Sequence, residues 1–247
     1  MLNTTTYDGP AGTPLLIAHG LYGSARNWGV LAKRLSDTRP VIAVDMRNHG
    51  DSPWHDSHSY DDMAEDLAGV IDGRWDVLGH SMGGKAAMML ALRHPDKVNR
   101  LIVADMAPVP YAHTQMEPLD AMRAVDLARV DSRADAKAQL AGKVAPGVDD
   151  FLLQSLDLKG QRWKLNLDVL AAEMDTILGF PDVEATFDGP VMFLSGANSD
   201  YVQRADRDRT LALFPNATFV KIPDAGHWLH AEKPREVEAA IRACLDG

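Results

Sequence analysis

Cysteine is nearly absent from this chain of 247 residues, which contains only Cys244. A single cysteine excludes an intrachain disulfide and any metal site built from several cysteines of one chain. Long apolar runs are also absent, because no segment approaches the roughly 18 uninterrupted apolar residues of a membrane-spanning helix. Residues 1–12 have neither the positive charge nor the apolar stretch of a signal peptide. From these absences we expect a soluble, cytoplasmic protein.

Basic residues are in deficit. The chain has 25 Lys and Arg against 35 Asp and Glu, for a net charge of −10. This surplus of acid is scattered along the chain and argues against a nucleic-acid partner. At 46% hydrophobic content the chain can bury one sizeable core, so we expect one domain that acts on a small molecule. A monomer and a homodimer are both compatible with this composition.

Short apolar runs alternate with longer stretches of helical period. This pattern is typical of an α/β fold with a mostly parallel central sheet and helices on both faces. The expected strands are residues 14–18, 41–44, 75–78, 101–104, 191–194 and 218–222. The expected helices of this core are residues 28–35, 60–71, 85–93, 204–214 and 234–245.

The alternation stops between residues 107 and 189, where helical stretches occur without a convincing strand. We therefore divide the single domain into a core, residues 1–106 and 187–247, and a helical cap insertion, residues 107–186, after the sixth strand of the fold. Within this cap insertion we expect helices at residues 118–130, 132–144, 149–156 and 167–178.

The strongest chemical signal is a Gly-x-Ser-x-Gly motif at residues 79–83, centred on Ser81. It directly follows an expected strand and directly precedes an expected helix. A serine on such a sharp strand-to-helix bend needs tiny neighbours, because the strand and the helix nearly touch. The helix N-terminus also favours negative charge that develops during acyl transfer. We interpret Ser81 as a nucleophile rather than as a simple helix cap.

A serine nucleophile needs a base, and nine histidines compete for that role. His227 follows the last expected strand, at the edge of the sheet where α/β folds bind their ligands. The chain order, serine before histidine, also fits this fold. His230 is the neighbouring alternative, but its position nearer the next helix favours a capping or surface role.

Two aspartates are candidates for the acid that orients the histidine. Asp200 follows the strand 191–194, but it lies one residue beyond the usual offset, which Ser199 occupies. Asp105 ends the strand 101–104, where a buried carboxylate needs a partner. We favour Asp105 and keep Asp200 as the alternative.

An oxyanion hole needs two N–H groups that point at one spot. Met82 supplies one by its position, and the glycine-rich loop after the first core strand offers the N–H of Leu21. His19 is expected to brace this loop through hydrogen bonds. The Asp-x-Arg-x-x-Gly-x-Ser sequence at residues 45–52 is interpreted as an ion-paired structural turn.

With these residues in view, the chain resembles the α/β-hydrolase superfamily over its whole length. The sequences at residues 19–24, 45–53, 79–85, 105–108 and 226–234 look like those of the bacterial YbfF-type esterases and their mitochondrial abhydrolase relatives. The resemblance implies that Asp105 is the triad acid, and Asp200 beside the usual position is a departure from it. It further implies esterase or acyl-thioesterase activity without a metal or organic cofactor. The N-terminus looks too short for the full leading hairpin of the fold.

The predicted function is therefore hydrolysis of short to medium acyl esters or thioesters by Ser81, His227 and Asp105. Aromatic and methionine side chains would line an adaptable acyl pocket. The expected pocket residues are Tyr22, Met106, Met122, Trp163, Tyr201 and Trp228. Alternatives with the same triad are a carbon–carbon bond hydrolase or lyase, a cofactor-free perhydrolase, and a hydrolase-fold protein that only binds its ligand.

Overall fold

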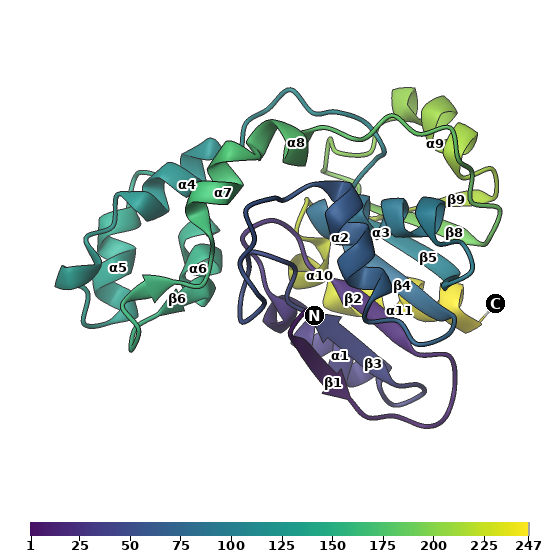
Figure 1. The fold of residues 1–247 in the computed structure, drawn as a ribbon, viewed down its shortest axis with the longest axis horizontal. Helices are drawn as coiled ribbons and strands as arrows, with labels where there is room; N and C mark the ends of the chain where they lie inside the picture. The colour runs from purple at the N-terminus through teal and green to yellow at the C-terminus, as the bar shows by residue number, and fades with distance from the viewer. Residues whose placement is uncertain (247) are drawn as a thin grey trace.

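The computed structural model describes residues 1–246 and contains a seven-stranded sheet in the order β1-β3-β2-β4-β5-β8-β9 (Figure 1). Only β1 is antiparallel to its neighbour, and the other pairings are parallel. The strands of this sheet are β1 (Thr4–Tyr7), β2 (Leu15–Ala18), β3 (Val41–Val44), β4 (Trp75–His80), β5 (Val98–Ala104), β8 (Val191–Gly196) and β9 (Ala217–Ile222). The expected mostly parallel α/β sheet is confirmed.

Helices cover both faces of the sheet, which explains why β2 and β3 are apolar at every position. One face packs against α1 (Gly29–Leu35) and α11 (Pro234–Asp246), and the other against α2 (Tyr60–Ala68) and α3 (Met82–Arg93). The remaining core elements are the short helices η1 (Ala25–Trp28), η4 (Arg204–Asp206) and α10 (Leu229–Glu232), and the helix α9 (Arg207–Leu213). No helix among residues 1–246 is long and apolar enough to cross a membrane.

The sequence analysis missed three core elements, the strand β1 and the short helices η1 and α10. It did not predict β1, whose sequence Thr-Thr-Thr-Tyr has no apolar alternation and whose residues are largely exposed at the edge of the sheet. It also missed α10, whose single turn is too short for a helical pattern. β4, β5 and β8 are longer than expected, because glycine and polar residues continue each strand beyond its apolar run.

The chain between β5 and β8 forms a separate group of helices that lies to one side of the sheet (Figure 1). Its elements are α4 (Met116–Arg123), η2 (Leu127–Arg129), α5 (Arg133–Leu140), α6 (Val148–Leu152), η3 (Leu153–Ser155), β6 (Leu156–Asp157), β7 (Arg162–Trp163), α7 (Leu167–Ala172) and α8 (Met174–Leu178).

One expectation for this segment is wrong in detail. It contains a strand pair, because β6 and β7 form a two-residue antiparallel hairpin around Lys159 and Gly160. Runs this short carry no alternation that a sequence pattern could reveal. The insertion point agrees with the expectation: the segment follows β5, which corresponds to the sixth strand of the fold because β1 alone precedes β2 where the fold has a leading hairpin. The division into a core and a cap insertion at residues 107–186 stays a prediction.

Candidate active site

Ser81 stands at the bend between β4 and α3 with φ +53° and ψ −120°, a backbone conformation that L-residues rarely adopt. Both flanking glycines of the motif are required by close backbone contacts. A Cβ on Gly79 would lie 2.1 Å from the carbonyl oxygen of Gly83, and a Cβ on Gly83 would lie 2.4 Å from that of His19. Because no side chain larger than that of glycine fits at positions 79 and 83, the backbone packs tightly on both sides of Ser81. This packing fixes the bend and the position of the Ser81 side chain.

Three side chains far apart in the sequence meet at this bend. The hydroxyl oxygen of Ser81 lies 2.9 Å from Nε2 of His227. On the other side of the ring, Nδ1 of His227 donates to Oδ2 of Asp105 over 2.7 Å. This arrangement leaves Nε2 unprotonated and able to accept the Ser81 proton.

The two candidate acids occupy different environments. Asp105 is fully buried, and its carboxylate also accepts hydrogen bonds from the Gly196 N–H (3.0 Å) and the Ser199 hydroxyl. Asp200 is exposed, and the hydrogen bond at this residue goes to its backbone oxygen from the side chain of Gln203. The structure thus brings Asp105, and not Asp200, to His227.

Ser199 is a residue of this site that the sequence analysis did not assign. Its hydroxyl donates a hydrogen bond to Oδ2 of Asp105, the same atom that accepts the hydrogen bond from Nδ1 of His227. The available signal was its position, because Ser199 stands where the usual acid of this fold would be. A small donor at that offset can hold a carboxylate that comes from the neighbouring strand.

His227 lies in the loop between β9 and α10, in contact with two aromatic rings. The ring of Tyr201 is stacked on the imidazole, with centroids 3.9 Å apart and an interplanar angle of 18°. Nε2 of His80 donates to the backbone oxygen of His227 over 2.9 Å.

His230, the alternative base, does not form the hydrogen bonds to Ser81 and Asp105 that His227 forms. It is buried against Trp28 at a centroid distance of 4.5 Å, and this burial lowers its pKa to about 4.

The loop that carries Leu21 is tightly held. His19 accepts a hydrogen bond from the Met46 N–H (2.9 Å) and donates to the oxygen of Gly20 (2.7 Å), as expected for a bracing residue. Tyr22 has a φ of +63° and donates its N–H to Nε2 of His49 (3.2 Å). The N–H of Met82 belongs to the first turn of α3 and has no acceptor within that helix.

Burial keeps the histidines behind this loop neutral. Desolvation lowers the pKa of His19, lowers that of His49 well below its usual value, and lowers that of His58 to about 3. Because neutral imidazoles can accept a hydrogen bond, His19 and His49 can serve as acceptors for backbone N–H groups here. Nε2 of His58 lies 3.2 Å from the sulfur of Met82, whose backbone N–H is the other candidate for the oxyanion hole.

The turn at residues 45–52 is structural, but it is not internally ion-paired as expected. Arg47 pairs with Asp62 and Asp66 of α2, at 3.1 and 2.6 Å. Asp45 instead accepts backbone N–H groups from Ala25 and Asp51. The sequence placed both charges in one turn, but it could not show that Arg47 pairs with α2 and that Asp45 binds backbone N–H groups instead.

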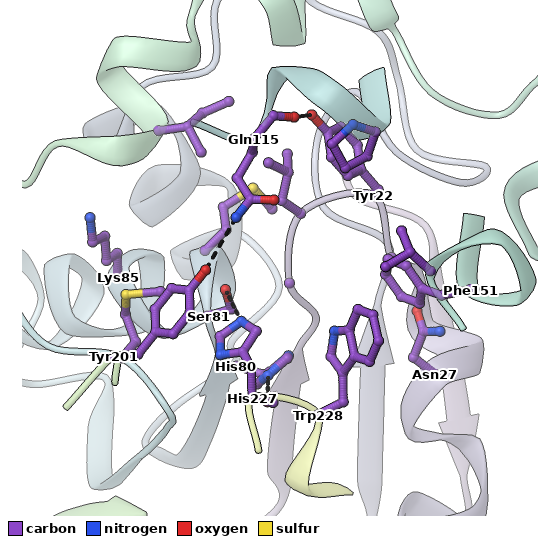
Figure 2. A pocket seen from close by; sticks show the side chains of 18 of the residues that line it. Tyr22, Asn27, His80, Ser81, Lys85, Gln115, Phe151, Tyr201, His227 and Trp228 are labelled. Carbon is purple, nitrogen blue, oxygen red and sulfur yellow. Dashed lines mark hydrogen bonds between the residues drawn. The ribbon is translucent and has the colours of Figure 1, made fainter. Parts of the chain in front are cut away.

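A cavity of about 260 Å³ opens at Ser81 between the sheet and the helices of the cap insertion. Of the expected pocket residues, it is lined by Tyr22, Met106, Tyr201 and Trp228, as well as by Leu21 and Met82 (Figure 2). Met122 and Trp163 do not line it. They are buried against each other, and Nε1 of Trp163 donates to the oxygen of Met122 over 3.0 Å. Both residues belong to the interior of the cap insertion.

Lys85 is a further pocket residue that the sequence analysis did not single out. It lies one turn beyond Ser81 on α3, and its ammonium donates to the oxygens of Leu178 and Gly179 in the cap insertion. Burial lowers its pKa to about 7. Its Nζ also lies 4.7 Å from the centre of the Tyr111 ring, so aromatic and carbonyl groups surround the charge.

No group of three His, Cys, Asp or Glu side chains within residues 1–246 is arranged to hold a metal ion. The polar groups at the floor of the pocket are instead the serine, the histidines and the backbone N–H groups described above. Their arrangement can activate a hydroxyl and stabilise an oxyanion, which are the two requirements of acyl transfer.

Comparisons with known proteins agree with this geometry. The model of the alpha/beta hydrolase family matches residues 15–240. The sn-1-specific diacylglycerol lipase ABHD11 of Mus musculus is 41% identical over 99% of this chain and 85% of its own length. Esterase YbfF of Escherichia coli is 40% identical over 95% of this chain and 93% of its own length. A solved marine microorganism esterase superposes with a TM-score of 0.93, at 37% identity and 98% coverage of both chains.

A serine elbow, a histidine after the last strand and a mostly parallel sheet define the class of α/β serine hydrolases. The chain belongs to the alpha/beta hydrolase family, and within it the relatives named above are of the YbfF and ABHD11 type. The predicted family resemblance is confirmed.

Proposed function

We propose that this chain hydrolyses carboxylic esters of short to medium acyl chains, with Ser81 as nucleophile, His227 as general base and Asp105 as the orienting acid. One observation carries the proposal, namely the continuous hydrogen-bonded series from Ser81 through His227 to the buried Asp105. The printed names of its relatives, which include an esterase and a lipase, support ester hydrolysis.

In the first step, Nε2 of His227 takes the Ser81 proton while the serine oxygen attacks the acyl carbon. The resulting tetrahedral intermediate collapses when His227 returns the proton to the leaving alcohol, which leaves an acyl-enzyme. Water, deprotonated by the same imidazole, then attacks the acyl-enzyme, and the acid product departs as Ser81 recovers its proton. Asp105 stays ionised throughout and stabilises the imidazolium.

Two backbone N–H groups are proposed to bind the oxyanion, those of Leu21 and Met82. Met82 lies at the N-terminus of α3, where the helix dipole favours negative charge. Leu21 lies in the turn closed by the bond from the Gly23 N–H to the oxygen of Gly20 (3.0 Å). Loss of one such donor costs about 3–4 kcal/mol of transition-state stabilisation in comparable sites.

The lining of the pocket supports an acyl substrate. Most of its exposed lining is apolar, with polar groups such as Lys85 and Gln115 among the apolar side chains, and its volume of about 260 Å³ is small for a ligand site. Met106, Phe151 and Trp228 can contact an acyl chain without fixing its length. Thioesters meet the same chemical requirements as esters and remain part of the proposal, as do a cytoplasmic location and a monomeric or homodimeric state.

Turnover of p-nitrophenyl acetate and p-nitrophenyl butyrate tests this function. We expect multiple turnovers by the wild-type protein and a loss of at least about 10⁴-fold in kcat for Ser81→Ala. Slow labelling of Ser81 without product release would instead support a protein that only binds its ligand. Unchanged turnover in Ser81→Ala would overturn the proposal.

A further inference from the structure

Tyr201 contacts the imidazole of His227 rather than merely facing the pocket. The two rings are nearly parallel, at 18°, with centroids 3.9 Å apart. This is closer than the 4.9 Å between the rings of His227 and His80, which are tilted by 37°. One face of the imidazole is therefore covered by the phenol ring, which limits the rotation of the His227 side chain.

The backbone that presents Tyr201 is tied to the other end of the triad. The Tyr201 N–H donates to the hydroxyl oxygen of Ser199 (3.3 Å), and that hydroxyl donates to Asp105. The loop 199–201 thus contacts both the acid and the base. A displacement of this loop would disturb both groups together.

The cap insertion contacts Tyr201 at three points, two on its hydroxyl and one on its backbone. Nε2 of Gln115 donates to the Tyr201 hydroxyl over 3.1 Å, and Nε2 of His113 lies 2.8 Å from the same oxygen. The hydroxyl of Tyr111 donates to the backbone oxygen of Tyr201 over 2.6 Å. Burial raises the pKa of Tyr201 to about 12, so its hydroxyl stays protonated at neutral pH.

Gln115 also contacts the oxyanion loop, by which we mean the loop that carries Leu21 and Tyr22. Its backbone oxygen accepts the hydroxyl of Tyr22 over 2.7 Å, while its side chain reaches Tyr201. Figure 2 shows Gln115 between these two tyrosines, above Ser81. A single residue of the cap insertion therefore contacts one side chain beside the base and one beside the oxyanion loop.

We propose that Tyr201 is a positioning residue for His227, whose stacked ring stabilises the charged imidazolium of the transition state, and that Gln115 and His113 hold this ring in place. The inference rests on the proposed function of His227 as base. A cation over an aromatic face is stabilised enough to change a rate by about threefold to thirtyfold. The interaction grows as the imidazole becomes charged, so it favours the transition state over the bound substrate.

A role as an ordinary pocket wall makes a different prediction. A residue that only contacts the acyl chain changes KM, and the change depends on the chain length. A residue that positions the base changes kcat by a similar factor for every ester. Phe151 provides the comparison, because it lines the same pocket and contacts Trp228, with ring centroids 5.5 Å apart, rather than His227.

The experiment measures kcat and KM for p-nitrophenyl acetate, butyrate and octanoate in wild type and four variants. Tyr201→Leu removes the aromatic face and should lower kcat about tenfold for all three esters. Tyr201→Phe restores the ring without the hydroxyl and should recover most of this loss. Gln115→Leu, which keeps the backbone bond to Tyr22, should lower kcat about twofold. Phe151→Leu should alter mainly KM, and most for octanoate.

The outcomes separate the inference from the function on which it rests. If Tyr201→Leu retains the wild-type kcat, or changes only KM in a chain-dependent way, the positioning role is overturned while ester hydrolysis stands. If Tyr201→Phe is as impaired as Tyr201→Leu, the ring face is not responsible and the inference also fails. If Ser81→Ala, measured in parallel, keeps full turnover, the proposed function itself is wrong. Thermal unfolding of each variant verifies that it is folded.

Discussion

The ends of the core strands and the cap insertion contribute to the site in different ways. In the core, Ser81 and Asp105 follow β4 and β5 directly, and both have positive φ values, +53° and +51°. The cap insertion contributes side chains such as Gln115 and Phe151 from short helices and loops. The comparison teaches that the reacting atoms depend on the backbone of the core, whereas the pocket shape depends on side chains that can vary at lower cost.

The largest expected effect concerns the two candidate acids of the core. Asp105→Asn should lower kcat by about 10⁴-fold, because His227 would lose the acceptor that sets its tautomer. Asp200→Asn is the matched control and should retain most activity, since the Asp200 side chain is exposed and is not the hydrogen-bond partner of His227. Steady-state kinetics on p-nitrophenyl butyrate gives both values. Mild and equal losses would contradict the assignment of Asp105.

A second test compares a glycine of the core with one of the cap insertion. Gly83→Ala would place a Cβ 2.4 Å from the backbone oxygen of His19, and we expect a loss of about 1–3 kcal/mol or more in the free energy of unfolding. Gly142→Ala meets nothing within 4 Å and bears only the strain of its positive φ, for about 1 kcal/mol. Urea unfolding measures both. A larger loss at Gly142 would contradict the view that the core is the rigid region.

The buried histidines should make the stability of the core depend on pH. The pKa of His58 is about 3 in the folded chain and near 6.5 when unfolded, because burial disfavours the charged ring. Between these values only the unfolded state binds the proton, so stability should fall as pH decreases, by up to about 1.4 kcal/mol per pH unit. His58→Gln should flatten this slope between pH 4 and 6.

The matched control for this slope lies in the cap insertion. His113, the one histidine of that segment, is exposed, so His113→Gln removes a histidine without removing a buried ring. Urea unfolding at several pH values compares the two variants. Equal slopes in wild type and His58→Gln would show that His58 does not carry the effect.

The smallest expected effect concerns the pocket wall of the cap insertion. Phe151→Leu removes aromatic surface but no group of the proposed triad. We expect KM to rise by about twofold to tenfold for octanoate esters and less for acetate, with little change in kcat. A uniform fall in kcat for all chain lengths would show that the cap insertion acts on the chemistry through this residue.

Much of the core could be predicted from the sequence because its constraints are local. The Gly-x-Ser-x-Gly motif around Ser81 records contacts of the backbone with itself, and β2 and β3 are apolar throughout because both faces of the sheet are covered. The position of Asp105 at the end of a buried strand likewise favoured it over Asp200 as the acid that orients the histidine. These patterns are visible in short stretches of sequence, even where the contacts that cause them, such as that of Gly83 with His19, join distant residues.

The features that escaped prediction depend on contacts between distant segments. Met122 and Trp163 look like pocket residues by composition, but the folding of the cap insertion buries them against each other. Tyr201 was expected in the pocket, yet its stacking on His227 follows from the paths of two separate loops. β1 was missed because pairing with β3, rather than its own polar sequence, makes it a strand.

The central claim is that Ser81 forms a covalent acyl-enzyme. Rapid mixing with p-nitrophenyl acetate, followed by acid quenching and mass spectrometry of peptides, tests it most directly. We predict one acetyl group on Ser81 in the wild-type protein and none on the peptide from Ser81→Ala. An acetyl group on another residue with turnover intact, or undiminished turnover by Ser81→Ala, would contradict it.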